Sequence, residues 1–143
     1  MFIEDYEIRE DLLYDCSYYW VRMEGQVATI GLTAYGQETM GDVLFLETAR
    51  PGDRVRCRDE VGSIESGKWV GKMMIPVSGT IVEVNNGLLH RLDLLNSDPY
   101  GEGWIMKIKL ENTDEGQNLM SPEQYGKWLE EEIEKEKRDE LMI

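Results

Sequence analysis

The sequence predicts a mainly β protein, a small sandwich or barrel that ends in one α-helix. Three observations predict this class. Short runs rich in β-branched residues alternate between apolar and polar positions, glycine and proline turns separate these runs, and residues 121–143 change to helical spacing. A chain of 143 residues is long enough for one compact domain with a modest hydrophobic core.

Five segments in the middle of the chain have strand-like patterns: residues 26–32, 42–47, 53–60, 79–85 and 104–110. In the third segment, Val55 and Cys57 are predicted to face the core, while the arginines between them face solvent. A Pro51-Gly52 pair marks the turn before this segment. Many short strands with such turns are typical of a β-sandwich or barrel.

Two segments have helical features. Residues 33–40 are predicted to form a short helix that ends at Gly41. Residues 121–124, Ser-Pro-Glu-Gln, form a capping box with proline at the first helical position, and apolar residues follow at helical spacing: Tyr125, Trp128, Leu129 and Ile133. We therefore expect an N-terminal extension (1–17), a β domain (18–120) and a C-terminal helix (121–143). The extension fits a strand, a short helix or a loose arm.

Composition excludes several classes of function. The 29 acidic and 15 basic residues give a formal charge of −14, which argues against a nucleic-acid or anionic membrane partner. No apolar run approaches a membrane span and the acidic start is unlike a secretory signal, so a cytoplasmic location is expected. Cys16 and Cys57 are expected to be small buried residues. With a single histidine, His90, the sequence predicts neither catalytic residues nor a metal site.

The segment 61–79 carries the candidate chemistry. It contains a polar tip, Glu65-Ser66-Gly67-Lys68, between two predicted strands. A lysine at an exposed hairpin tip suits covalent attachment of a swinging cofactor, because its amine can be acylated at the end of a long stem. The alternatives are a solvated lysine in a turn, or attachment at Lys72 within Gly71-Lys72-Met73.

Over most of its length the chain resembles the H proteins of the glycine cleavage system. The matching stretches stand in the same order as in that family: Trp20-Val21, residues 27–33, residues 41–43, residues 51–53, residues 65–68, residues 76–79, residues 83–85 and residues 96–104. The resemblance implies a barrel-sandwich hybrid of the lipoyl and biotinyl type, with lipoate covalently attached to Lys68 beside Glu65, Ser66 and Gly67. It implies a carrier rather than an enzyme, because the cofactor does the chemistry.

The resemblance also implies partners. A lipoate ligase or lipoyl transferase would load the arm, which would then visit glycine decarboxylase, aminomethyltransferase and dihydrolipoyl dehydrogenase. Tyr19 and Lys72 depart from the family, because they stand where glycine-cleaving members carry acids that suit a cationic aminomethyl cargo. Two alternatives therefore stay open. One is a sulfur carrier that serves a heterodisulfide-reductase-like sulfur oxidation complex, and the other is an unmodified interaction module.

Overall fold

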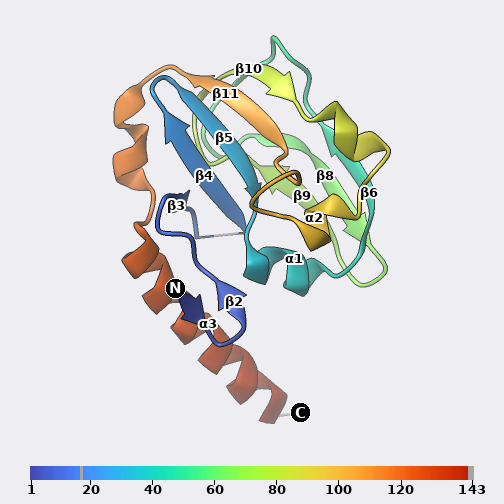
Figure 1. The fold of residues 1–143 in the computed structure, drawn as a ribbon, viewed down its shortest axis with the longest axis vertical. Coiled ribbons are helices and arrows are strands. Elements are labelled where there is room, and N and C mark those ends of the chain that lie inside the picture. The colour runs from blue at the N-terminus through green and yellow to red at the C-terminus, as the bar shows by residue number, and fades with distance from the viewer. Residues whose placement is uncertain (17, 142–143) are drawn as a thin grey trace.

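The computed structural model describes residues 1–16 and 18–141, which form two facing β-sheets flanked by helices (Figure 1). The predicted boundary between the N-terminal extension and the β domain falls at residue 17, which lies outside the described residues. Among the described helices, none combines the length and the apolar character needed to cross a membrane. The predicted mainly β class with short helices and a C-terminal helix is confirmed.

The larger sheet has six strands, and every pairing in it is antiparallel. In spatial order they are β3 (Leu13–Tyr14), β4 (Tyr19–Glu24), β5 (Val27–Leu32), β11 (Met106–Leu110), β10 (Gly79–Val84) and β7 (Arg54–Val55). Glu24 pairs with Val27, so β4 and β5 are joined by a two-residue turn in which Gly25 has a φ of +62°. Glycine adopts this left-handed conformation without steric cost.

The smaller sheet carries the candidate attachment site. Its strands are β6 (Val43–Thr48), β8 (Glu60–Ser66) and β9 (Val70–Met74), also antiparallel. The main hydrophobic core joins the two sheets: Val21, Ile30 and Ile108 from the larger sheet belong to one buried cluster with Ile64 and Met73 from the smaller one. This core holds β8 and β9, and with them the hairpin that joins these strands.

The helices begin and end at the expected signals. In α1 (Ala34–Met40) the Thr33 hydroxyl accepts a hydrogen bond from the amide of Gly36 at 2.9 Å, and Gly41 ends the helix with a φ of +80°. Before α3 (Pro122–Leu141) the amides of Ser121 and Gln124 each donate to the other's side chain, at 2.9 and 3.2 Å. The remaining helices are short: η1 (Asn86–Leu89), α2 (Leu94–Ser97) and η2 (Thr113–Asn118).

The N-terminal segment is a small hairpin followed by residues 8–14, three of which are buried. The hairpin consists of β1 (Phe2–Ile3) and β2 (Tyr6–Glu7). A second hydrophobic cluster then joins this segment to α3, with Ile8, Leu12 and Tyr14 buried against Tyr125 and Leu129. The extension is therefore part of the packing that holds the C-terminal helix.

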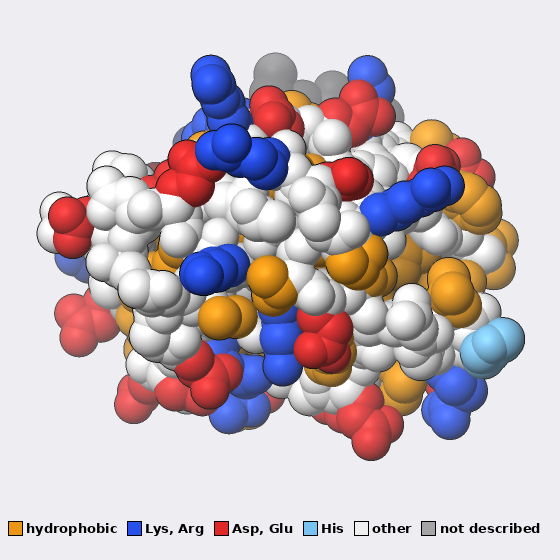
Figure 2. Space-filling view, turned by 90° about the horizontal axis from the view of Figure 1, so that it is seen from above, with side chains coloured by type: hydrophobic (Ala, Val, Ile, Leu, Met, Phe, Trp, Pro, Cys, Tyr) orange, Lys and Arg blue, Asp and Glu red, His pale blue; other side chains and the backbone are white. Residues whose placement is uncertain are grey.

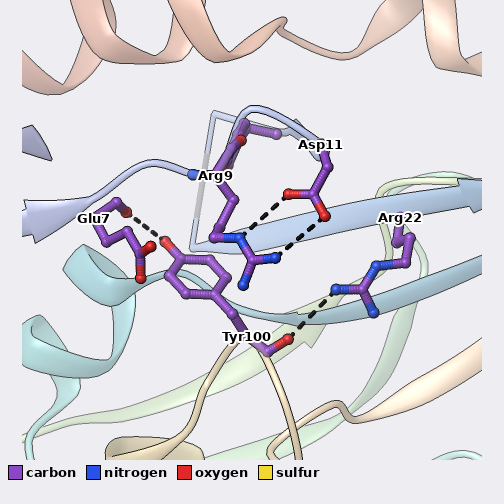
Figure 3. A network of polar contacts seen from close by, with 6 residues as sticks. Glu7, Arg9, Asp11, Arg22 and Tyr100 are labelled. Carbon is purple, nitrogen blue, oxygen red and sulfur yellow. Dashed lines mark hydrogen bonds and ion pairs between the residues drawn. The ribbon is translucent and has the colours of Figure 1, made fainter. Parts of the chain in front are cut away.

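A polar network centred on Tyr100 connects the N-terminal segment to the larger sheet (Figure 3). The Tyr100 hydroxyl donates to the Glu7 carbonyl at 2.7 Å, and Arg22 of β4 donates to the Tyr100 carbonyl at 3.4 Å. Nearby, the guanidinium of Arg9 pairs with the carboxylate of Asp11 at 3.3 Å. Because Tyr100 is itself buried, the network fixes this segment against the body of the protein.

The segment 53–60 differs from its prediction. Arg54–Val55 is a short strand and Glu60 already begins β8, but between them the Asp59 carboxylate accepts the Arg56 amide at 2.9 Å and the chain bends into a turn. Alternation therefore stops after Val55, and Cys57 is exposed. Cys16 is exposed as well, so the prediction that both cysteines are buried is wrong.

Candidate functional site

The hairpin between β8 and β9 presents Lys68 in a short, well-bonded loop. The amide of Ser66 donates to the carbonyl of Trp69 at 2.8 Å, which closes the turn around Gly67 and Lys68. The Ser66 hydroxyl oxygen accepts the amides of Lys68 and Trp69 at 3.3 and 3.0 Å, and the same hydroxyl donates to the carbonyl of Met40. One serine side chain thus connects the hairpin tip to the end of α1.

The Lys68 side chain is exposed, and its stem crosses the end of α1. A Cβ atom placed on Gly41 would lie 2.8 Å from Cε of Lys68, closer than ordinary van der Waals contact. Gly41 also requires glycine for its backbone, since its φ is +80°. From the sequence, Gly41 is expected to end the helix and belongs to one of the stretches that match the family, and the structure also places it under the side chain of Lys68.

The other predicted tip residues have different surroundings. Glu65 is exposed on β8 and pairs in register with Phe45 on one side and Val70 on the other. Gly67 has open space around it, because a Cβ atom there would meet nothing within 4 Å. The structure therefore brings Glu65, Ser66, Gly67 and Lys68 to one tip. Among these four side chains, that of Ser66 forms the hydrogen bonds that hold the turn.

Trp69 is an aromatic residue of the tip whose role the sequence analysis missed. Its indole lies across Gly71, where a Cβ atom would be only 2.1 Å from the ring. Its ring also meets Tyr18 edge-on, with centroids 6.0 Å apart. The signal in the sequence is the Trp69-x-Gly71 spacing, since residues two apart on a strand share one face.

Beyond Tyr18, an aromatic cleft opens between α1 and α3. It is lined by Tyr18, Tyr35 and Trp128 together with the carboxylates of Glu132 and Glu136, and Cys16 stands at its edge. Its cavity volume is about 430 Å³. The Tyr35 hydroxyl donates to Glu136, and burial, followed by this hydrogen bond, raises the pKa of Tyr35. The cleft therefore combines apolar ring faces with two acidic side chains.

Tyr19 and Lys72 are the two residues that depart from the family at positions of acids. Neither side chain lies at the hairpin tip that presents Lys68. Tyr19 is only 3% exposed and belongs to the main core, where burial strongly raises the pKa of its hydroxyl. Lys72 lies within β9, and its ammonium is 3.5 Å from the carboxylate of Glu60 at the opposite end of β8 from the tip. The side chain of Tyr19 is therefore part of the core packing.

Charged side chains of both signs share the surface of the protein (Figure 2). Figure 2 shows one face on which basic, acidic and hydrophobic side chains are interspersed. The turn region 50–58 contains four exposed arginines, one of which, Arg54, pairs with Glu111 at 3.1 Å. His90 is exposed after η1, and within the described residues no group of three or more His, Cys, Asp or Glu side chains is arranged to hold a metal ion.

Comparisons with known proteins agree with one another. The family model described as Glycine cleavage H-protein matches residues 12–132. The glycine cleavage system H protein of Rubrobacter xylanophilus is 44% identical over 88% of this chain and 98% of its own. The mitochondrial H protein of Pisum sativum is 41% identical over 87% of this chain and 76% of its own. The crystal structure of the H protein from Mycobacterium marinum superimposes with a TM-score of 0.75 at 28% identity, covering 82% of this chain and 95% of the other.

Proposed function

Because this chain belongs to the glycine cleavage H-protein family, a family of lipoyl carriers, we propose that it carries lipoate on Lys68 and shuttles an aminomethyl group. The single observation that carries this assignment is the position of Lys68. It is exposed in the loop between β8 and β9, whose backbone amides are bonded by the Ser66 hydroxyl, at the matching position of the family motif. Lys72, by contrast, lies within a strand and pairs with Glu60.

The surroundings of the tip fit the cofactor. Lipoate on an amide arm supplies a dithiolane that opens to two thiols and carries the transferred group. The chain would supply presentation and protection. The Trp69 and Tyr18 rings lead from the tip to the aromatic cleft, whose apolar faces suit an alkyl chain and sulfur atoms.

The acids of the cleft favour the aminomethyl cargo over the sulfur cargo. Tyr19 and Lys72 supply no carboxylate, but Glu132 and Glu136 of α3 bring two into the cleft beside Tyr18. A carboxylate within a few ångströms stabilises a cationic adduct and does nothing comparable for a neutral sulfur-bearing arm. The partners would then be glycine decarboxylase, aminomethyltransferase and dihydrolipoyl dehydrogenase, with a lipoate ligase or lipoyl transferase as the loading enzyme.

The first experiment tests the attachment residue. The chain is produced together with a lipoate ligase, and its intact mass is compared with that of Lys68→Arg and of the matched control Lys72→Arg. We expect the lipoyl mass increment in the natural chain and in the control, and no increment in Lys68→Arg. An increment that persists in Lys68→Arg but disappears in Lys72→Arg would overturn the assignment, and no increment in any chain would favour the unmodified module.

The second experiment tests the cargo. The lipoylated chain is the variable substrate of glycine decarboxylase, and carbon dioxide release from glycine is measured. We expect turnover comparable to that of an ordinary H protein, and slower turnover for Glu132→Gln with Glu136→Gln, in which the carboxylate charges are lost. A fully lipoylated chain that gives no glycine-dependent release would refute the aminomethyl proposal and favour the sulfur carrier.

A further inference from the structure

The two cysteines of the chain, far apart in sequence, line the same pocket. The cavity has a volume of about 410 Å³ and lies between the N-terminal segment, the turn after β7 and the segment before α3. Cys16 stands on one wall, Cys57 and Arg58 stand on another, and Met74, Pro76 and Met120 complete the apolar part. Both cysteines are exposed as free thiols, so small reagents in solvent reach them.

Cys57 is held as a protonated thiol. Its S–H donates to the carbonyl of Pro76 at 3.3 Å, and its amide donates to the hydroxyl oxygen of Ser78 at 2.8 Å. Burial is the largest effect on its sulfur and raises the pKa of the thiol, while the positive charge of Arg58 acts in the opposite direction. A thiol in this state is a poor first nucleophile, because the thiolate is the reactive form.

Cys16 has a different environment, because the guanidinium of Arg58 lines the same pocket. The sulfur of Cys16 is the first of the causes that raise the pKa of Arg58. Arg58 has a φ of +77°, a conformation that residues with side chains seldom adopt. The turn therefore places the positive charge of Arg58 in the same pocket as the sulfur of Cys16.

We propose that this pocket is a thiol-modification site for small-molecule disulfides, in which Cys16 attacks first and Cys57 resolves. The Cys16 thiol gives its proton to solvent, and the thiolate attacks one sulfur of the disulfide. A mixed disulfide forms on Cys16 and one thiolate leaves. Cys57 then loses its proton and attacks the Cys16 sulfur, so a Cys16–Cys57 disulfide forms and the second thiolate leaves. The two cysteines lose two electrons, and the small disulfide gains them.

This proposal does not depend on lipoylation. The site does not use Lys68, although Cys16 also stands at the edge of the aromatic cleft, and a chain without lipoate contains only the thiols of Cys16 and Cys57. The closed disulfide would join the N-terminal segment to the turn between β7 and β8, two parts that α3 and β10 otherwise hold separately. We expect the oxidised chain to unfold at a higher temperature than the reduced chain, because a cross-link between distant residues restricts the unfolded state.

The experiment uses the full chain without lipoate and oxidised glutathione as the probe. Intact mass and peptide mapping are followed over time at neutral pH. We expect the natural chain to lose the mass of two hydrogens, with residues 16 and 57 cross-linked and no glutathione retained. Cys57→Ser should retain one glutathione on Cys16, and Cys16→Ser should react far more slowly.

The contribution of Arg58 has its own control. Arg58→Gln should slow the first attack, whereas the neighbouring exposed Arg56→Gln should change its rate little, because Arg58 lines the pocket and Arg56 is not part of that lining. Two outcomes would overturn the proposal. One is a natural chain that ends with a glutathione on each cysteine or with both thiols unreacted, and the other is a Cys16→Ser variant that reacts as fast as Cys57→Ser.

Discussion

Replacing Leu129 by alanine tests the packing of α3 against the N-terminal segment. Leu129 is fully buried, and its neighbours in the second hydrophobic cluster include Ile8, Leu12 and Trp20. Tyr125, one turn before it, stacks on Tyr14 with ring centroids 4.3 Å apart. Because α3 and the N-terminal segment are closely packed here, their side chains cannot move far enough to fill the space that Leu129 leaves. A residual cavity is therefore expected.

A Leu→Ala change in a core that cannot collapse lowers the free energy of unfolding by about 2–5 kcal/mol. For a chain of this size each kcal/mol lowers the melting temperature by about 4 °C, so we expect a decrease of about 8–20 °C. Urea unfolding followed by circular dichroism should show a lower midpoint with an unchanged slope. The matched control is Glu130→Ala, the next residue along, which is exposed and should change the free energy by less than about 0.5 kcal/mol. Equal midpoints for the two variants would refute the reasoning, because α3 would then be a loose appendage.

Three further predictions concern the body of the protein. Gly62→Ala should lower the free energy of unfolding by several kcal/mol, since the glycine has a φ of +150° and a Cβ atom would lie 1.8 Å from the Glu47 carbonyl oxygen; chemical denaturation measures the loss. Burial raises the pKa of Tyr100 to about 12, above the value of about 10 expected in the unfolded chain, so its contribution to stability is complete below about pH 10 and is lost as the pH rises through 12. Denaturation curves measured between about pH 10 and 12 should show a decrease in the free energy of unfolding of the natural chain. The decrease should be smaller in Tyr100→Phe, which keeps the effect of every other group that titrates in this range. Tyr19→Glu should leave little folded protein because it buries a carboxylate in the main core, whereas Tyr19→Phe should fold, as circular dichroism would show.

The parts of the fold that the sequence predicts well are those with a local signal. Short β-branched runs bounded by turn signals placed β5 and β10, alternation placed β11, and the reciprocal Ser121 and Gln124 pattern placed the start of α3. These signals involve residues that are close in sequence, so they can be recognised without knowledge of the tertiary structure.

The parts that the sequence could not predict depend on contacts between distant residues. Cys57 has an alternating pattern around it, but the Asp59 carboxylate bends the chain there and exposes the thiol. The N-terminal strands have two residues each, too few for a periodic pattern. The aromatic cleft joins Tyr18 to Trp128, and only the packing of α3 on the second cluster brings them together.

The fastening of the hairpin tip by Ser66 has a consequence for any enzyme that acts on Lys68. A loop that is already ordered gives up little conformational entropy when an active site encloses it, so more of the contact energy remains for binding. In the folded chain the loop is already ordered by the Ser66 hydroxyl, which is hydrogen-bonded to both the tip and the end of α1. An enzyme that acts on Lys68 would thus meet a preorganised backbone shape as well as the side chains that surround the lysine.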